Sequence, residues 1–186
     1  MRDAVQLYGN PRSRKREPGF ATLVRIIIDQ QVSVQAGAAI WRRLEAAAGI
    51  VEPASVNALG EQGLREAGLS GPKARYVLGI AEAVAAGELD LARLGRCREE
   101  TVFRELTKLK GIGRWTAEIY MMFAMGRPDI LPVGDIALQS SAGRLLELSE
   151  RPGADELEVI GERWRPYRSV AAIMLWHFYK KMPAER

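Results

Sequence analysis

The chain has 186 residues, of which 47% are hydrophobic. This composition is typical of a globular chain that can bury a sizeable core, and it excludes an intrinsically disordered protein. The 27 Lys and Arg residues exceed the 23 Asp and Glu residues, which gives a formal net charge of +4 and an isoelectric point near 9.4. A mildly basic chain can bind nucleic acid, but its charge alone fits an ordinary basic protein equally well.

The chain contains one cysteine, Cys97, and one histidine, His177. One cysteine excludes a disulfide within the chain, a cysteine zinc site and a four-cysteine iron–sulfur cluster, and one histidine excludes a multi-histidine metal site. The N-terminus lacks the apolar segment of a secretory signal, and no apolar run approaches the roughly 20 residues that a membrane span needs. We therefore expect an intracellular, cytoplasmic protein without a membrane segment.

The first 19 residues are predicted to be irregular, and they include a basic cluster at residues 12–16. This cluster is either a solvated tail or a contact to a DNA backbone. The apolar spacing of the next segment predicts a helix from Phe20 to about Asp29. Ser33 can then cap a second helix that ends at Gly49. The polar junction between the two helices is either an ordinary turn or a loop that reaches a partner.

Helical patterns continue to the end of the chain, interrupted by glycine and proline. The predicted helices are two short ones within 53–68, broken near Gly60 and Gly63, and others at 73–87, 89–93, 99–108, 136–148, 155–164 and 168–181. Since no segment predicts a β-strand, the predicted fold class is all-α, with about ten helices. We expect a single domain of two helical lobes with a cleft between them, one lobe at 30–108 and the other at 1–29 and 109–186.

The segment from Leu109 to Gly113 is a glycine-bearing turn between two helical patterns. Glycine tolerates a positive φ and lets another backbone approach closely, and the amides of the next helix suit a phosphate. The nearby Lys108, Lys110 and Arg114 add positive charge. A glycine turn of this kind is a weak signal by itself, whereas the longer string LKGIGRWTA is much more specific.

A second turn, at residues 131–134, delivers Asp135 to the start of a predicted helix. Aspartate is a favoured N-cap, so a purely structural role is enough to explain it. An ionised carboxylate at a helix N-terminus can also stabilise a positive charge that develops on a sugar, or deprotonate a water molecule. The two roles are compatible, and a lone carboxylate suits a leaving group that is already activated.

Two tryptophans accompany these turns. Trp115 follows Gly113 by two residues, and Trp176 lies on the last apolar helix. Each indole either packs in the core or, if both approach Asp135, forms one wall of an aromatic pocket. Such a pocket would bind an electron-poor, cationic base by stacking and by cation–π attraction.

Together these patterns resemble the helix-hairpin-helix (HhH-GPD) DNA glycosylase superfamily, and within it the 3-methyladenine DNA glycosylase II family. The resemblance covers most of the chain, from about Phe20 to Tyr179, and is carried by IIDQQVSVQAG, GLSGPKARYV, LKGIGRWTAEIYMMFAMGRPDILPVGD and WRPYRSVAAIMLW. It implies a base-excision-repair enzyme that flips an alkylated purine out of duplex DNA and hydrolyses its N-glycosidic bond, leaving an abasic site.

The resemblance also implies a role for each residue at a matching position. Asp135 would be the catalytic carboxylate, and Gln31 would wedge into the duplex. The base pocket would be formed by Trp115, Trp176 and Ile119. The DNA backbone would be held by Lys110, Gly111, Ile112, Gly113, Arg114 and Thr116. No cofactor is required, although a structural Na⁺ or K⁺ would bind the backbone carbonyls of Thr107, Leu109 and Ile112.

Relatives that also cleave the DNA strand place a Schiff-base lysine where this chain has Trp115, so the resemblance implies a monofunctional glycosylase without lyase activity. We expect a monomer that acts on double-stranded DNA with lesions of the 3-methyladenine or 7-methylguanine type. Departures from the family at Gln31, Ile119 and Gly134 bear on the range of bases more than on the reaction. Two other interpretations stay open: a glycosylase for oxidised or deaminated bases, and a non-catalytic, structure-specific DNA-binding protein.

Overall fold

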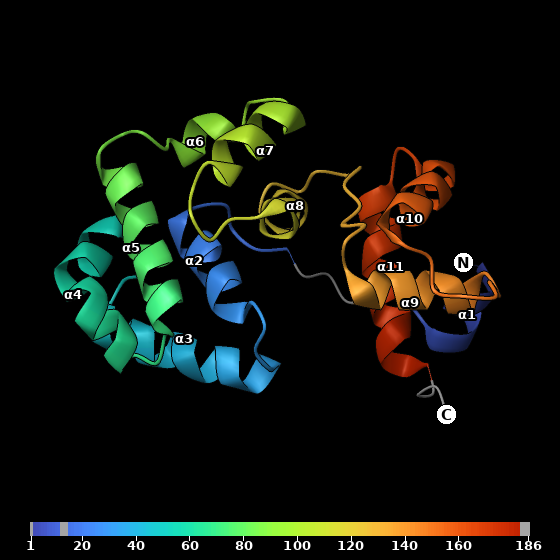
Figure 1. The fold of residues 1–186 in the computed structure, drawn as a ribbon, viewed down its shortest axis with the longest axis horizontal. Helices are drawn as coiled ribbons and strands as arrows, with labels where there is room; N and C mark the ends of the chain where they lie inside the picture. Colours follow the sequence, from blue (N-terminus) through green and yellow to red (C-terminus); the bar gives the residue numbers. More distant parts are fainter. Residues whose placement is uncertain (1, 12–14, 183–186) are drawn as a thin grey trace. The chain divides into compact units, whose positions relative to one another are not determined.

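The computed structural model of the chain describes residues 2–11 and 15–182, and every regular element in these residues is a helix, which confirms the all-α prediction. In chain order (Figure 1) the elements are α1 (Arg2–Tyr8), α2 (Phe20–Asp29), α3 (Val34–Ala48), α4 (Pro53–Glu66), α5 (Gly71–Ala85), α6 (Leu91–Leu94), α7 (Glu99–Thr107), α8 (Arg114–Phe123), α9 (Ile136–Leu145), α10 (Ala154–Gly161), the 3₁₀ helix η1 (Glu162–Trp164) and α11 (Arg168–Lys181). Each helix in these residues is too short or too polar to cross a membrane.

The chain divides into two compact units. The terminal unit consists of residues 1–15 and 126–186, and the central unit consists of residues 16–125. This division differs from the expected lobes at 30–108 and at 1–29 with 109–186. The physical reason is that α2 packs on α3, α5 and α8, so both α2 and the helix after the hairpin join the central unit.

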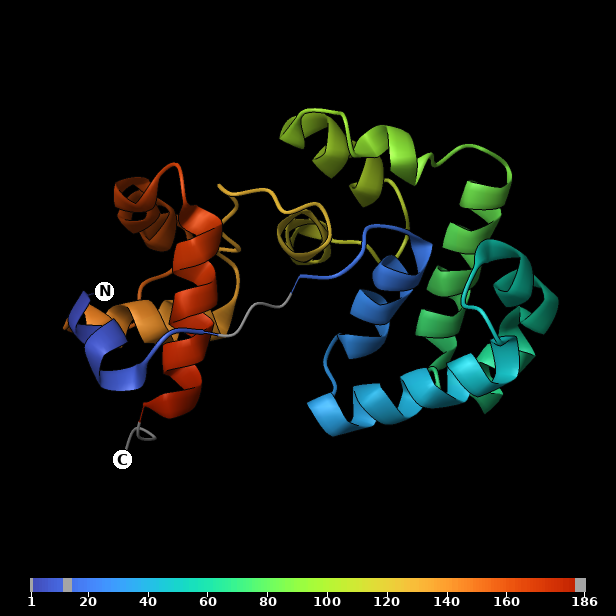
Figure 2. The same ribbon diagram turned by 180° about the vertical axis from the view of Figure 1, so that it is seen from behind.

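In the terminal unit α11 packs on α9, and the two helices cross each other (Figure 2). The buried residues of each helix recur at helical spacing, so each helix presents one packed face to the other. Leu138 and Ala142 of α9 and Leu175 and Phe178 of α11 are each at most 1% exposed. This packing fixes α9 and α11 relative to each other within the unit.

The prediction of an irregular N-terminal segment is wrong for residues 2–8, which form α1. The ring of Tyr8 lies against Phe178 with 5.7 Å between ring centroids, and the carbonyl of Tyr8 accepts hydrogen bonds from Nε2 of His177 (3.0 Å) and Nζ of Lys181 (2.8 Å). A seven-residue helix is not stable alone in water, so these contacts with α11 account for α1. The sequence of residues 2–8 alone does not reveal these contacts with α11.

In the central unit α2 is the most apolar helix, and α3, α5 and α8 pack around it. Its residues Leu23, Val24, Ile27 and Ile28 have no exposed surface, as expected for a helix that is covered on several sides. The predicted interruption near Gly60 is present within α4, where a φ of 61° and a ψ of −174° leave the helical region.

Candidate active site and nucleic-acid interface

Asp135 stands immediately before α9 and caps it. The turn that leads to it is closed by a hydrogen bond from the amide of Asp135 to the carbonyl of Pro132, at 2.9 Å. Oδ1 of Asp135 accepts hydrogen bonds from the amides of Ala137 (2.9 Å) and Leu138 (3.1 Å). The predicted N-cap is therefore present, and the dipole of α9 stabilises the ionised carboxylate.

Trp176 of α11 reaches the same carboxylate. Its indole Nε1 donates to Oδ1 of Asp135 at 3.1 Å, and both residues are half-buried. The structure therefore brings Trp176 to Asp135, as the aromatic-pocket prediction requires. A carboxylate oriented by three donors before any substrate arrives is preorganised to face a positive charge.

The segment that leads to Asp135 is anchored to the first turn of α11. The side chain of Arg168 is 12% exposed and binds both carboxylate oxygens of Asp129, from Nε to Oδ1 at 2.9 Å and from Nη2 to Oδ2 at 3.1 Å. Oγ of buried Ser169 accepts from the amide of Ile130 at 2.9 Å. Burial acts to raise the pKa of Asp129, but the hydrogen bonds and the charge of Arg168 outweigh it, and the pKa lies below its ordinary value.

The hairpin turn between α7 and α8 depends on Gly111. Its φ of 90° lies in the left-handed region that favours glycine, and a Cβ at this position would collide with the ring of Tyr76. The amide of Ile112 donates to the carbonyl of Leu109 at 3.1 Å and closes the turn. The sequence predicted that another backbone would approach this turn, but the close neighbour of Gly111 is the side chain of Tyr76 of α5.

Lys110, Gly113 and Arg114 form the exposed surface of the hairpin. Gly113 is the N-cap of α8, and because glycine has no side chain it does not itself cover the first turn of the helix. Arg114 is 58% exposed and pairs with buried Glu118, from Nε to Oε1 at 2.9 Å. This surface combines two cations with a helix N-terminus, which is the arrangement that suits a phosphate.

Two residues that were predicted to hold the DNA backbone support the hairpin from inside. Ile112 and Thr116 are each 3% exposed. Oγ1 of Thr116 accepts a hydrogen bond from Nε2 of Gln30 at 2.8 Å. Their side chains therefore do not face a phosphate, and a contact of the DNA backbone with the main-chain amides of this segment stays a prediction.

Gln31 occupies the junction between α2 and α3. It is exposed, and its φ of 51° is uncommon for a residue other than glycine. Backbone conformations of this kind concentrate at ligand contacts and other functional positions. The structure gives the predicted wedge an accessible place, and its contact with a duplex stays a prediction.

Sequence reasoning missed two residues, Gln30 and Lys73, that join this junction to the hairpin and to α5. Nε2 of Gln30 donates to the carbonyl of Gly111 at 3.1 Å, in addition to its bond with Thr116. Nζ of Lys73 donates to the carbonyls of Gln30 (2.6 Å) and Ile28 (2.8 Å). These partners lie 43 to 86 residues apart, so a local pattern does not reveal them. The one available signal was a lysine in the first turn of a helix, where the dipole disfavours a cation.

Trp115 and Ile119 lie on α8 in the central unit, whereas Asp135 and Trp176 belong to the terminal unit. Trp115 is half-buried, and Ile119 is 8% exposed. The predicted site residues therefore fall into two groups, one in each unit. A base pocket that combines the two groups stays a prediction.

The described residues contain no group of three His, Cys, Asp or Glu side chains that could bind a metal ion. The predicted Na⁺ or K⁺ would instead bind the carbonyl oxygens of Thr107, Leu109 and Ile112. Neutral carbonyl oxygens suit an alkali cation and do not suit zinc. The carbonyl of Leu109 already accepts one hydrogen bond, from Ile112, and a carbonyl oxygen has a second lone pair for a cation.

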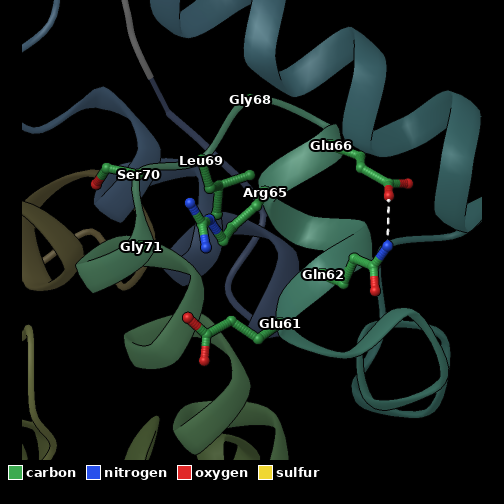
Figure 3. Close-up of a pocket in the computed structure, with 8 residues that line it drawn as sticks. All are labelled: Glu61, Gln62, Arg65, Glu66, Gly68, Leu69, Ser70 and Gly71. Atoms are coloured by element: carbon green, nitrogen blue, oxygen red, sulfur yellow. Dashed lines mark hydrogen bonds between the residues drawn. The ribbon is translucent and has the colours of Figure 1, made fainter.

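A groove of about 860 Å³ lies where α4 ends and α5 begins (Figure 3). Glu61 and Glu66 line it together with Arg65, and Gln62 donates to Glu66 at 3.0 Å. Two carboxylates repel a phosphate backbone, and none of the predicted site residues lines this groove. Its volume therefore does not make it a better candidate than the surroundings of Asp135.

The basic cluster at residues 12–16 is described in part, because residues 12–14 lie outside the described residues. Lys15 is exposed, and Arg16 pairs with Asp29 at 3.3 Å. Arg16 thus has a structural partner within the central unit. A contact between this cluster and DNA stays a prediction.

Known proteins resemble the chain in sequence and in fold. Residues 24–166 match the family model described as HhH-GPD superfamily base excision DNA repair protein. The Bacillus subtilis protein YfjP is 31% identical over 165 residues, which are 84% of this chain and 58% of that protein. The chain therefore spans little more than half the length of that curated relative.

Two solved structures share the fold over nearly the whole chain. The crystal structure of a DNA-3-methyladenine glycosidase from Bacillus halodurans superposes with a TM-score of 0.84 at 36% identity, covering 95% of this chain and 82% of that one. The 3-methyladenine DNA glycosylase Mag1 of Schizosaccharomyces pombe, in complex with abasic DNA, gives a TM-score of 0.88 at 28% identity and covers 96% and 90%.

Proposed function

Because the chain belongs to the HhH-GPD superfamily of base excision DNA repair proteins, we propose that it is a DNA glycosylase that removes alkylated purines from double-stranded DNA. The observation that carries the proposal is the carboxylate of Asp135, held by two amides of α9 and by the indole of Trp176. The proposed lesions are of the 3-methyladenine and 7-methylguanine type, and the names of the two similar solved proteins support 3-methyladenine.

In the proposed reaction the N-glycosidic bond of a flipped nucleotide breaks, and its electron pair leaves with the base. An alkylated purine carries a positive charge in DNA, so it departs as a neutral molecule. The carboxylate of Asp135 stabilises the positive charge on the deoxyribose and accepts a proton from the water molecule that attacks the anomeric carbon. The products are a free base and an abasic site.

The proposal includes a monofunctional reaction. An indole has no amine that could attack the sugar, and by the resemblance Trp115 would occupy the position at which strand-cleaving relatives carry lysine. The expected product is therefore an intact strand with an abasic site. Trapping with borohydride, which fixes a Schiff base to DNA, is expected to give no covalent complex.

The proposed DNA contacts lie on the central unit, except for Trp176, which belongs to the terminal unit. Lys110, Gly113 and Arg114 would hold the backbone, beside a Na⁺ or K⁺ on the hairpin carbonyls that adds positive charge near a phosphate. Gln31 would fill the place of the flipped nucleotide, while Trp115 and Trp176 would stack on the base. We further propose that the protein acts as a monomer within the cell, on duplex DNA.

A panel of duplexes, each with one lesion, tests this function. The panel contains 3-methyladenine, 7-methylguanine, an oxidised base and a deaminated base, with the undamaged duplex as reference. Wild-type protein is expected to release the two alkylated purines. Release confined to the oxidised or deaminated base would replace the proposed lesion class, and binding without any release would indicate a non-catalytic DNA-binding protein.

Asp135→Asn is the variant to run on the same panel. Asparagine is also a good N-cap, so α9 should keep its start while the negative charge is lost. We expect the rate of base release to fall by roughly 100-fold or more. Asp155→Asn, which changes an exposed acid in the first turn of α10, is the matched control and should retain the wild-type rate. Wild-type release by Asp135→Asn would remove Asp135 from the mechanism.

A further inference from the structure

The first turns of α5 contact both the wedge junction and the hairpin. Lys73 and Tyr76 are three residues apart and therefore lie on one face of α5. Lys73 bonds to the end of α2, while the ring of Tyr76 packs on Gly111. Since these two contacts come from one helix face, α5 fixes the position of the wedge junction relative to the hairpin, the two elements proposed to contact DNA.

Lys73 acts as a cap for α2. The last carbonyls of a helix have no partner within the helix, and a cation at this end is favoured by the dipole. Nζ of Lys73 meets the carbonyls of Ile28 and Gln30 at 2.8 and 2.6 Å, and Asp29 lies close enough to favour its charge. Burial lowers the pKa of Lys73. Burial and the dipole of α5 both disfavour the charge of Lys73. Its favourable interactions are instead with the end of α2.

Gln30 continues the connection from Lys73 to the hairpin. Its carbonyl accepts from Lys73, and its side-chain amide donates to Gly111 before the hairpin turn ends and to Thr116 within α8. The next residue is Gln31, with its left-handed φ of 51°. The residue that precedes the wedge is therefore bonded on one side to α5 and on the other to the hairpin turn and to α8.

We propose that Lys73 and Gln30 are positioning residues that fix the Gln31 wedge relative to the hairpin, so that gripping the DNA backbone places the wedge at the flipped nucleotide. The inference rests on the proposed function. Lys73 needs no contact with DNA for this role, because it acts through the backbone that immediately precedes Gln31. Its loss should therefore weaken recognition of a vacated nucleotide position while leaving the general grip on DNA intact.

The test compares affinities for two duplexes, one undamaged and one with a tetrahydrofuran abasic-site analogue beside 2-aminopurine. In Lys73→Met, which keeps a similar length without charge or donors, we expect affinity for undamaged DNA within about twofold of wild type. Preference for the abasic analogue should fall roughly 10- to 100-fold, the effect of one or two lost charge-assisted hydrogen bonds. The increase in 2-aminopurine fluorescence on binding should become smaller together with this preference.

A double-variant comparison separates positioning from general stability. If Lys73 acts through the wedge, Lys73→Met should change the preference less than about twofold when Gln31 is already alanine. Lys73→Arg, which retains donors, should recover most of the preference, and Arg96→Met, which removes an exposed cation of the central unit, should keep all of it. Wild-type preference in Lys73→Met, or an undiminished loss in the Gln31→Ala background, would overturn the proposal.

Gln30→Met provides a second route if Lys73→Met does not fold. This variant keeps the carbonyl that Lys73 binds and removes only the amide donors to the hairpin, so the same loss of preference is expected, and an unchanged preference overturns the proposal. The binding assay requires no base release. A wild-type protein that prefers the abasic analogue but releases no base therefore refutes the proposed function without refuting the positioning role.

Discussion

Three hydrogen bonds converge on Oδ1 of Asp135, two from amides of α9 and one from the indole of Trp176. The amide donors belong to the main chain and survive side-chain substitutions in α9. The indole donor can be removed without changing the helix. Trp176 is therefore the residue at which the orientation of the carboxylate can be altered while its charge and its cap are retained.

Trp176→Phe should lower the single-turnover rate of base release about tenfold, because a smaller aromatic ring remains but the Nε1–H donor is lost. One net hydrogen bond contributes roughly 1 kcal/mol, so the free energy of unfolding should fall by no more than about 1.5 kcal/mol. Trp164→Phe, an equivalent substitution in η1, is the control for the general effect of replacing a tryptophan in the same unit. A wild-type rate in Trp176→Phe would show that the indole hydrogen bond does not matter for the reaction.

Single residues were predictable from the sequence where their role is local. Ser33 and Asp135 were expected as N-caps, and both accept the expected amide hydrogen bonds. Gln30 and Lys73 were not found, because their partners are distant in sequence and are brought together only by the packing of α2, α5 and α8. Spacing within one helix contains no information about such a bond.

At the scale of elements, the connection between α8 and α9 has no regular structure over residues 126–134, yet it has to place Asp135. Its stability comes from α11, through the ion pair of Arg168 with Asp129 and the hydrogen bonds of Ser169. The side chains of Arg168 and Asp129 are 12% and 17% exposed, so solvent screens this pair only in part. The pair therefore links the connection to the same helix that carries Trp176.

Asp129→Asn should lower the free energy of unfolding by about 2–3 kcal/mol at neutral pH, because the mostly buried Arg168 loses its close contacts with a carboxylate and retains the longer ion pair with Glu162, at 3.6 Å. The pKa of Asp129 is lower in the folded state than its ordinary value of 3.8, so the contribution of the ionised form is complete above that value and is lost as the pH falls through the folded pKa. The difference in the free energy of unfolding between wild type and Asp129→Asn should thus become smaller below about pH 3.8. Urea unfolding at pH 7, 5 and 3 measures it.

The control for that series is Asp155→Asn, an exposed acid whose loss should cost about 0.5 kcal/mol or less. A gap between wild type and Asp129→Asn that stays constant from pH 7 to pH 3 would contradict an electrostatic role for Asp129. In that case any destabilisation would come from lost hydrogen bonds of the Asp129 side chain and not from its charge.

The bounds of two helices were predicted closely. The last helix was expected at 168–181 and is α11 at Arg168–Lys181, and the helix from Phe20 ends at Asp29 as expected. α1 was missed because it depends on Tyr8 contacting α11. The predicted helix at 155–164 is split into α10 and η1, since its last turn is 3₁₀, which the apolar period does not distinguish from α.

At the scale of the molecule, the chain leaves the terminal unit near residue 15 and returns to it near residue 126. The sequence predicts two lobes with boundaries at residues 29/30 and 108/109, and it assigns α2 and the hairpin to the lobe that contains the C-terminus. The structure groups them with α3 and α5, since α2 buries its apolar surface there. The hairpin and the wedge thus share one unit, and the catalytic candidate Asp135 belongs to the other.

Binding of duplex DNA should depend on salt in a way that identifies the hairpin as the gripping surface. Each phosphate contact adds about 0.9 to the slope of log affinity against log salt concentration. In the pair Lys110→Ala and Arg114→Ala this slope should fall by about 1 to 2. The pair Arg93→Ala and Arg96→Ala also removes two positive charges, so both double variants take the formal net charge from +4 to +2. An equal change of slope in both would mean that DNA responds to the net charge of the protein, and that the hairpin has no special part in the grip.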